Sequence, residues 1–147
     1  MGLTYRAIRG VGLTVSVLDG EISQAEYLEY ARRQNADRDW HATTRSLIDA
    51  RTVLTPPGAE QVLASISATY EQMRADDAPS RTAIVAGHDF ALASQYGETR
   101  TEAGTLTIAF HDLSTACIWL DVELELVQQT IGELREELTG AAPNQRG

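Results

Sequence analysis

Short apolar runs alternate along the chain with longer segments in which apolar residues recur every three or four positions. Three such runs, over residues 46–50, 82–86 and 105–110, are each followed within a few residues by a helical pattern. A β-prone run, a turn and a helix in this order are typical of parallel βα units. We therefore expect a parallel sheet with helical crossovers.

Two further apolar runs, closer to the N-terminus, predict a β-hairpin. Residues 3–9 and 13–19 flank a turn that contains two glycines, and turns of this kind join antiparallel strands. In the second run, as in 105–110, apolar and polar residues alternate. Alternation is typical of a strand with one buried face and one face in water, so we expect one face of the sheet to be exposed.

Most of the helices begin at a clear start signal. A serine and a glutamate three residues later form a capping box ahead of a helix over residues 24–35. Thr55 and the proline after it predict an N-cap and a first helical position. Asp89 and Asp112 are the expected N-caps of two further helices. Residues 97–104 contain two glycines and lack periodicity, which predicts a loop.

The apolar residues near the C-terminus form a narrow seam at alternating intervals of four and three. The seam fits a helix that packs on its own domain, and it equally fits a symmetric helix–helix contact between two copies. Gly132 within it would let a partner backbone approach closely. The seam consists of Leu120, Leu124, Val127, Ile131, Leu134 and Leu138.

These elements predict an α/β fold. The expected sheet is mixed and mostly parallel, with five strands, an N-terminal hairpin and sequential right-handed βα units. Helices should lie mainly on one face, with an extra C-terminal helix. At 147 residues the chain fits a single domain, expected over residues 1–139 with a helical extension from about residue 121, and a disordered tail over 140–147.

The chain resembles the SpoIIAA-like, STAS-related bacterial domains between Tyr5 and Leu120. The likeness rests on Leu47–Arg51 followed by Thr55–Pro56, on Arg81–Val85 followed by Asp89–Ala91, and on Phe110–Leu113 with Ala116 and Trp119–Leu120. It implies a βα superhelix with the hairpin strand at its edge. In better-known relatives a phosphorylated serine opens one helix. Here that stretch reads Thr-Pro-Pro-Gly over 55–58, so Thr55 is the nearby candidate for phosphorylation.

Charge excludes several classes of partner. The formal net charge is -9 and all twelve cations are arginine, whereas binding to a polyanion needs clustered cations. We therefore expect no nucleic acid and no anionic membrane surface as partner. The sequence has no run of about 18 apolar residues that would insert into a membrane, and a cytoplasmic location is the default expectation.

Polar residues gather at the carboxyl ends of the predicted strands, where ligands of α/β proteins usually bind. Twice in the sequence a histidine is followed directly by an aspartate. Together with another aspartate and an arginine, these two His-Asp pairs could hold a ligand or a metal, or support acid–base chemistry. However, adjacent residues do not share one face of a regular element, and both His-Asp aspartates are expected caps. We expect no catalysis, metal or cofactor here. The candidates are Asp49, Arg51, His88, Asp89, His111 and Asp112.

Three functions remain open. The first is a noncatalytic protein-interaction or regulatory domain that binds a protein partner and forms a homodimer. The second is a carrier or sensor of a small apolar, lipid-like ligand, which a pocket lined by Val62, Ile66, Phe90 and Tyr96 would favour. The third is a small enzyme or metal site, which a metal or anion touching both His88 and His111 would favour.

Overall fold

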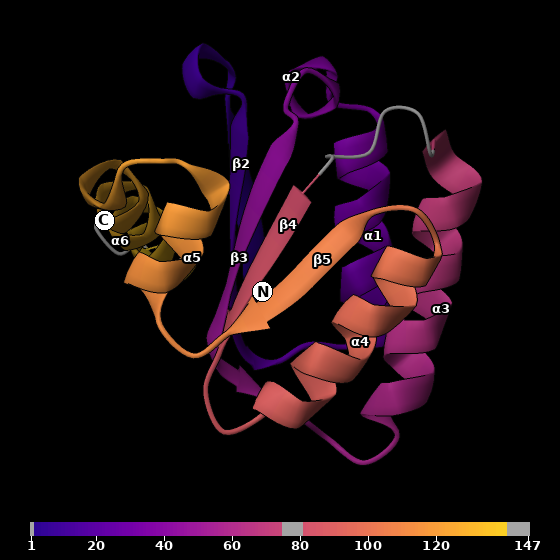
Figure 1. Cartoon of the computed structure of the whole chain (residues 1–147). Coiled ribbons are helices and arrows are strands. Elements are labelled where there is room, and N and C mark those ends of the chain that lie inside the picture. Colours follow the sequence, from indigo (N-terminus) through magenta and orange to yellow (C-terminus); the bar gives the residue numbers. More distant parts are fainter. Residues whose placement is uncertain (1, 75–80, 141–147) are drawn as a thin grey trace.

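The computed structural model describes residues 2–74 and 81–140 of the chain, and Figure 1 shows their arrangement. The strands are β1 (Leu3–Ile8), β2 (Leu13–Glu21), β3 (Arg45–Leu54), β4 (Arg81–Ala86) and β5 (Leu106–Phe110). The helices are α1 (Gln24–Asn35), α2 (Arg38–His41), α3 (Ala59–Arg74), α4 (Phe90–Glu102), α5 (Leu113–Leu120) and α6 (Leu124–Gly140).

The five described strands form one mixed sheet in sequential order, β1-β2-β3-β4-β5. β1 and β2 pair antiparallel, with Ile8 opposite Leu13 next to the turn. All the other neighbours pair parallel. The predicted α/β fold with its N-terminal hairpin and sequential βα units is therefore confirmed.

Helices cover both faces of the sheet. The three crossover helices α1, α3 and α4 lie on one face, while α5 and α6 lie on the other (Figure 1). Beneath α5 and α6, the apolar residues of β2 pack with Leu47 and Val85 into the main core. The expectation of an exposed face is wrong, because after β5 the chain folds back across it.

The polar positions of β2 face α1 instead of water. Thr14 and Ser16 are both fully buried. The hydroxyl of Thr14 lies 2.9 Å from that of Thr43, and the hydroxyl of Ser16 lies 2.5 Å from that of Tyr30. Hydroxyls paired in this way can be buried at little cost, which is why alternation misled the sequence-based prediction.

The C-terminal seam packs on its own domain. Val127, Ile131 and Leu134 of α6 are buried against the sheet, and Leu124 and Leu138 pack beside them. A left-handed backbone conformation at Asp121 separates α6 from α5, so the C-terminal extension is a distinct helix. Gly140 still belongs to α6, and the rest of the predicted tail, 141–147, lies outside the described residues.

The predicted helix starts are confirmed for three helices and wrong for α3. The capping box ahead of α1 forms, Asp112 caps α5 with its side chain, and Asp89 holds the N-cap position of α4. α3, in contrast, begins at Ala59, after a turn in which Gly58 has a φ of +84°. Thr55 is therefore not its N-cap.

The prediction of a loop over residues 97–104 is largely wrong, since α4 continues to Glu102. Gly97 lies against β5, and a Cβ at this position would be 2.9 Å from the carbonyl oxygen of Thr107. The glycine thus permits close packing of helix on strand. As a result, Arg100 occupies a buried helical position.

Candidate functional site

A pocket of about 170 Å³ lies between the sheet and the crossover helices α1, α3 and α4. Its floor comes from β3, β4 and β5, and its walls come mainly from the three helices. Most of its surface is apolar. For comparison, an engineered apolar cavity of about 150 Å³ in another protein holds benzene, so the pocket is large enough for a small organic molecule.

The outer end of the pocket, at the carboxyl ends of the strands, combines apolar side chains with the carboxylate of Asp89. Leu54, the last residue of β3, and Thr55 directly after it line this outer end and are exposed, Leu54 by 51%. The hydroxyl of Thr55 donates a hydrogen bond to the carboxylate of Asp89 and so ties the β3–α3 connection to the start of α4. Apolar side chains follow inwards from α3, β3 and β4: Ala50, Ile48, Val62, Leu63, Ile66, Ile84 and Ala86.

The inner end of the pocket has a polar floor. Four hydroxyl residues form a row across the parallel strands, each opposite the next: Thr14, Ser46, Thr82 and Thr107. All four are buried. Thr14 and Thr107 have hydrogen-bond partners. The hydroxyls of Ser46 and Thr82, which line the pocket, make no hydrogen bond to another described residue.

Arg100 lines the same inner end and is only 7% exposed. Its Nη1 donates to the carbonyl and hydroxyl oxygens of Ser67, at 3.1 and 3.2 Å, and its Nη2 donates to the hydroxyl of Thr105 at 3.3 Å. The guanidinium also lies 5.6 Å from the ring centre of Tyr70. Within residues 2–74 and 81–140, it has no carboxylate partner.

Aromatic residues complete the walls. Tyr27, Tyr30, Tyr70 and Tyr96 line the pocket together with Trp40. Burial raises the pKa of Tyr27, Tyr30 and Tyr96 to about 12, and it raises the pKa of Tyr70 as well. The hydroxyl of Tyr70 donates to the side-chain oxygen of Gln34 at 2.5 Å. These phenols are therefore neutral at physiological pH and can only contact or hydrogen-bond a ligand.

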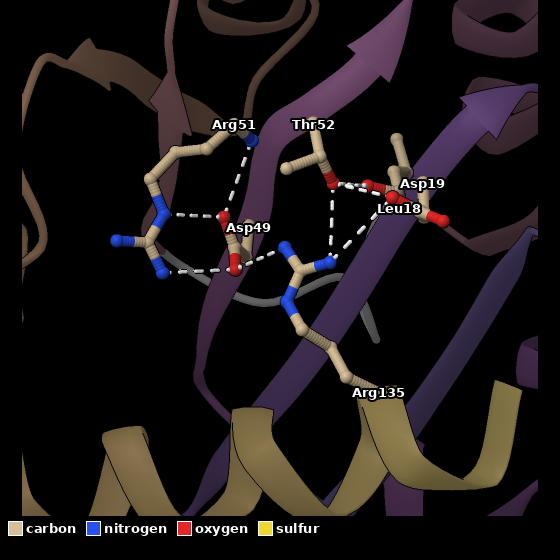
Figure 2. Close-up of polar contacts among 6 residues, drawn as sticks. All are labelled: Leu18, Asp19, Asp49, Arg51, Thr52 and Arg135. Carbon is tan, nitrogen blue, oxygen red and sulfur yellow. Dashed lines mark hydrogen bonds and ion pairs between the residues drawn. The ribbon is translucent and has the colours of Figure 1, made fainter. Parts of the chain in front are cut away.

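Two of the predicted site residues, Asp49 and Arg51, lie on the opposite side of the sheet, facing α6. Figure 2 shows the fully buried carboxylate of Asp49 between the guanidinium groups of Arg51 and Arg135. Arg51 donates from Nε at 2.8 Å and from Nη2 at 3.0 Å, while Arg135 donates from Nη2 at 2.9 Å. Both carboxylate oxygens are thus occupied, which gives this cluster a structural role.

Burial alone would raise the pKa of Asp49. The hydrogen bonds from Arg51 and Arg135 outweigh that effect and lower the pKa below its ordinary value. Asp49 therefore stays ionised at neutral pH, and it is not placed as a general acid or base.

The two His-Asp pairs do not form a shared site. His88 is exposed and its Nε2 lies 3.7 Å from the carboxylate of Asp89. His111 stacks on Phe90 with their ring centres 3.7 Å apart, and Asp112 caps α5. Hydrogen bonds from Thr115 and Ser114 lower the pKa of Asp112. Among the described residues, no group of three or more His, Cys, Asp or Glu is arranged to hold a metal ion.

The structure contains the pocket that would favour a carrier of a small ligand, with one difference in its lining. Val62, Ile66 and Tyr96 line it, whereas Phe90 faces His111 instead. The sequence-based reading missed Arg100, because it placed that residue in a loop. It also missed the hydroxyl row, although each of the four residues stands at the same place in its strand.

Comparison of the chain with protein-family profiles, with curated proteins and with solved structures gives no match. The resemblance to SpoIIAA-like domains therefore stays a prediction. No helix of the described residues has both the length and the apolar character needed to cross a membrane.

Proposed function

We propose that this chain is a noncatalytic carrier or sensor of a small apolar ligand, which it binds between the sheet and the helices α1, α3 and α4. The observation that carries the proposal is the pocket itself. Ligand sites in proteins are concave and mostly apolar, with a few polar groups that orient the ligand. This pocket is mostly apolar, with polar groups at its inner end and the carboxylate of Asp89 at its outer end.

The size of the pocket limits the ligand. A volume of about 170 Å³ suits one ring or a short chain, and it is too small for a whole phospholipid. The paired Asp49 and the capping Asp112 lie outside the pocket, and the carboxylate of Asp89, which lines its outer end, accepts a hydrogen bond from Thr55. These features favour reversible binding over chemistry.

A matched pair of substitutions on α4 tests the proposal. Ala93 lines the pocket, whereas Ala91 on the same helix is exposed. Toluene binding to the full-length protein would be measured by calorimetry and by the shift of the melting temperature. We expect saturable binding by the wild-type protein and by Ala91→Leu, and none by Ala93→Leu, whose side chain fills the space. Saturable binding that Ala93→Leu leaves unchanged, or no binding by the wild type, would contradict the proposal.

A second candidate function is self-association through the edge of the sheet. The seam on α6 is already used within the domain. On the same face, however, Leu106 and Ile108 of β5 remain exposed, and Ile118 of α5 is 78% exposed. Exposed apolar residues beside an unpaired edge strand favour association. The exposed apolar surface on β5 and α5 supports the homodimer that is expected from the sequence.

Sedimentation velocity tests this second function. We expect the wild-type protein to sediment as a dimer and Ile118→Asp as a monomer. The control is Ile22→Val, which changes a buried side chain in the smaller core far from β5. If the wild-type protein is monomeric at all concentrations, this second function is wrong.

The resemblance to SpoIIAA-like domains agrees with both proposals, because it implies the sequential sheet order with a hairpin at the edge. The phosphorylation of Thr55 remains a prediction. Its exposed position at the outer end of the pocket, with its hydroxyl bound to Asp89, supports a regulatory effect on ligand entry.

A further inference from the structure

Resting on the proposed function, we infer that the ligand is a small apolar monocarboxylate, whose carboxylate Arg100 holds at the inner end of the pocket. Four observations support this inference: the burial of Arg100, its unused hydrogen-bond donors, the polar floor at the same end of the pocket, and the distribution of charge along the pocket.

The first observation is a buried cation without an acidic partner. A buried charge is expensive unless another charge or several hydrogen bonds compensate it. Arg100 is 7% exposed and receives only neutral partners, Ser67, Thr105 and the face of Tyr70, within the described residues. In contrast, Arg6, Arg51 and Arg135, all more exposed, each contact a carboxylate.

The second observation concerns the hydrogen-bond donors of Arg100. A guanidinium has five N–H groups, and the hydrogen bonds of Arg100 to described residues come from Nη1 and from one N–H of Nη2. Its Nε and the other N–H of Nη2 remain. These are the same two nitrogens through which Arg51 holds the carboxylate of Asp49. The protein thus contains its own example of the geometry, a bidentate arginine–carboxylate pair.

The third observation is the polar floor beside Arg100. The hydroxyls of Ser46 and Thr82 line the pocket and make no hydrogen bond to any described residue. A hydroxyl can donate to a carboxylate oxygen. The inner end therefore offers a carboxylate hydroxyl donors as well as the guanidinium of Arg100.

The fourth observation is the distribution of charge along the pocket, which orients the ligand: the cation Arg100 lies at the inner end and the carboxylate of Asp89 at the outer end. Apolar residues such as Ile48, Ile84 and Ala86 separate the hydroxyl row from the exposed outer end at Leu54. The carboxylate consequently lies deep and the apolar body points towards the β3–α3 connection.

The test compares benzoate with benzamide, which has nearly the same shape but no charge. With the wild-type full-length protein, we expect benzoate to bind about ten- to a hundredfold more tightly, as is typical of hydrogen bonds to charged groups. Arg100→Gln should lose this preference and still bind benzamide. Arg38→Gln, at an exposed position on α2, is the control and should keep the preference. Thr82→Val should weaken benzoate more than benzamide.

The outcomes separate this inference from the proposed function. If the wild-type protein binds benzamide as tightly as benzoate, the carboxylate inference is wrong while the pocket still binds ligands. If it binds toluene but neither of the two polar compounds, the inference is wrong as well. If it binds none of the three, both proposals fail. The wild-type comparison decides these cases even if Arg100→Gln does not fold.

Discussion

The guanidinium of Arg135 on α6 lies 2.9 Å from the fully buried carboxylate of Asp49 on β3. The pair joins two residues that are 86 positions apart in the sequence, and it fixes the C-terminal helix on the sheet (Figure 2). Arg135 also donates from Nη1 to the hydroxyl of Thr52 at 3.1 Å. α6 is thus held by polar contacts as well as by its apolar seam.

We expect Arg135→Met to lower the free energy of unfolding by about 1.5–3 kcal/mol, the usual contribution of a hydrogen bond to a charged group. The loss stays below that of a fully orphaned buried charge because Arg51 still pairs with Asp49. Urea denaturation measures the change. Glu136→Gln, an exposed charge on the same helix, should leave the free energy unchanged, and an equal effect of both substitutions would argue against the pair.

The same carboxylate predicts an acid dependence of stability. The folded pKa of Asp49 is lower than its ordinary value of 3.8. The unfolded chain therefore takes up the proton first as the pH falls. The stability that Asp49 contributes is fully present above pH 3.8 and is lost as the pH falls through the folded pKa. Denaturation curves that extend from pH 6 to well below pH 3.8 should show a constant difference between the wild type and Asp49→Asn above about pH 5 and a shrinking difference below pH 3.8. A difference that stays constant below pH 3.8 as well would contradict this assignment.

The buried tyrosines predict that the stability of the folded protein falls at alkaline pH. All five tyrosines of the chain have raised pKa values, and burial is the main cause. Because the unfolded residues ionise near the ordinary value of 10.0, the stability contributed by the neutral phenols is complete below pH 10. It is lost as the pH rises towards 12, the folded pKa of Tyr27, Tyr30 and Tyr96.

Tyrosinate absorbance checks this prediction. The folded protein should show little phenolate absorbance at pH 10.5, whereas the same protein in denaturant should be largely ionised. A folded-state midpoint near 10 would show that the tyrosines around the pocket are accessible to water.

Two glycines give a matched test of the packing that positions Arg100. A Cβ on Gly97 would approach the carbonyl oxygen of Thr107 to 2.9 Å, whereas a Cβ on Gly132 meets no atom within 4 Å. We expect Gly97→Ala to destabilise the protein by about 1–3 kcal/mol through overpacking. Gly132→Ala should stabilise it by up to about 1 kcal/mol, because alanine is the better helix former.

Thermal unfolding of both variants measures these changes. A neutral Gly97→Ala would mean that α4 does not pack closely on β5. If Gly132→Ala instead destabilises the protein and dissociates a dimer, the result would support close packing of a partner backbone against α6.

The local pattern of the chain was enough to predict the strands and their order, since each apolar run is short and ends at a turn or a helical pattern. The surface against which each element packs could not be predicted from this local pattern. The alternation in β2 looks the same whether Thr14 faces water or, as here, the hydroxyl of Thr43. The helical seam at Val127 likewise fits packing on either its own sheet or a partner.

The candidate site was harder to predict than the fold. Strand-end residues such as Asp49 and His111 are chemically suggestive, yet they point to different faces or into structural contacts. The sequence pattern did not place Arg100 on a helix, because Gly97 interrupts the helical periodicity. The reason for a glycine at this position is its close approach to Thr107, which only the structure shows. The polar row is visible only after Ser46 and Thr82 are aligned by the strand register.

The most direct test of the pocket is to measure by NMR which methyl groups of the protein lie close to bound toluene. The proposed site predicts intermolecular NOEs to Ile66 on α3 and to Ile84 on β4, which line opposite sides of the pocket. NOEs confined to exposed methyl groups such as those of Ile118, or none at saturating toluene, would contradict the claim that this chain binds a small ligand inside.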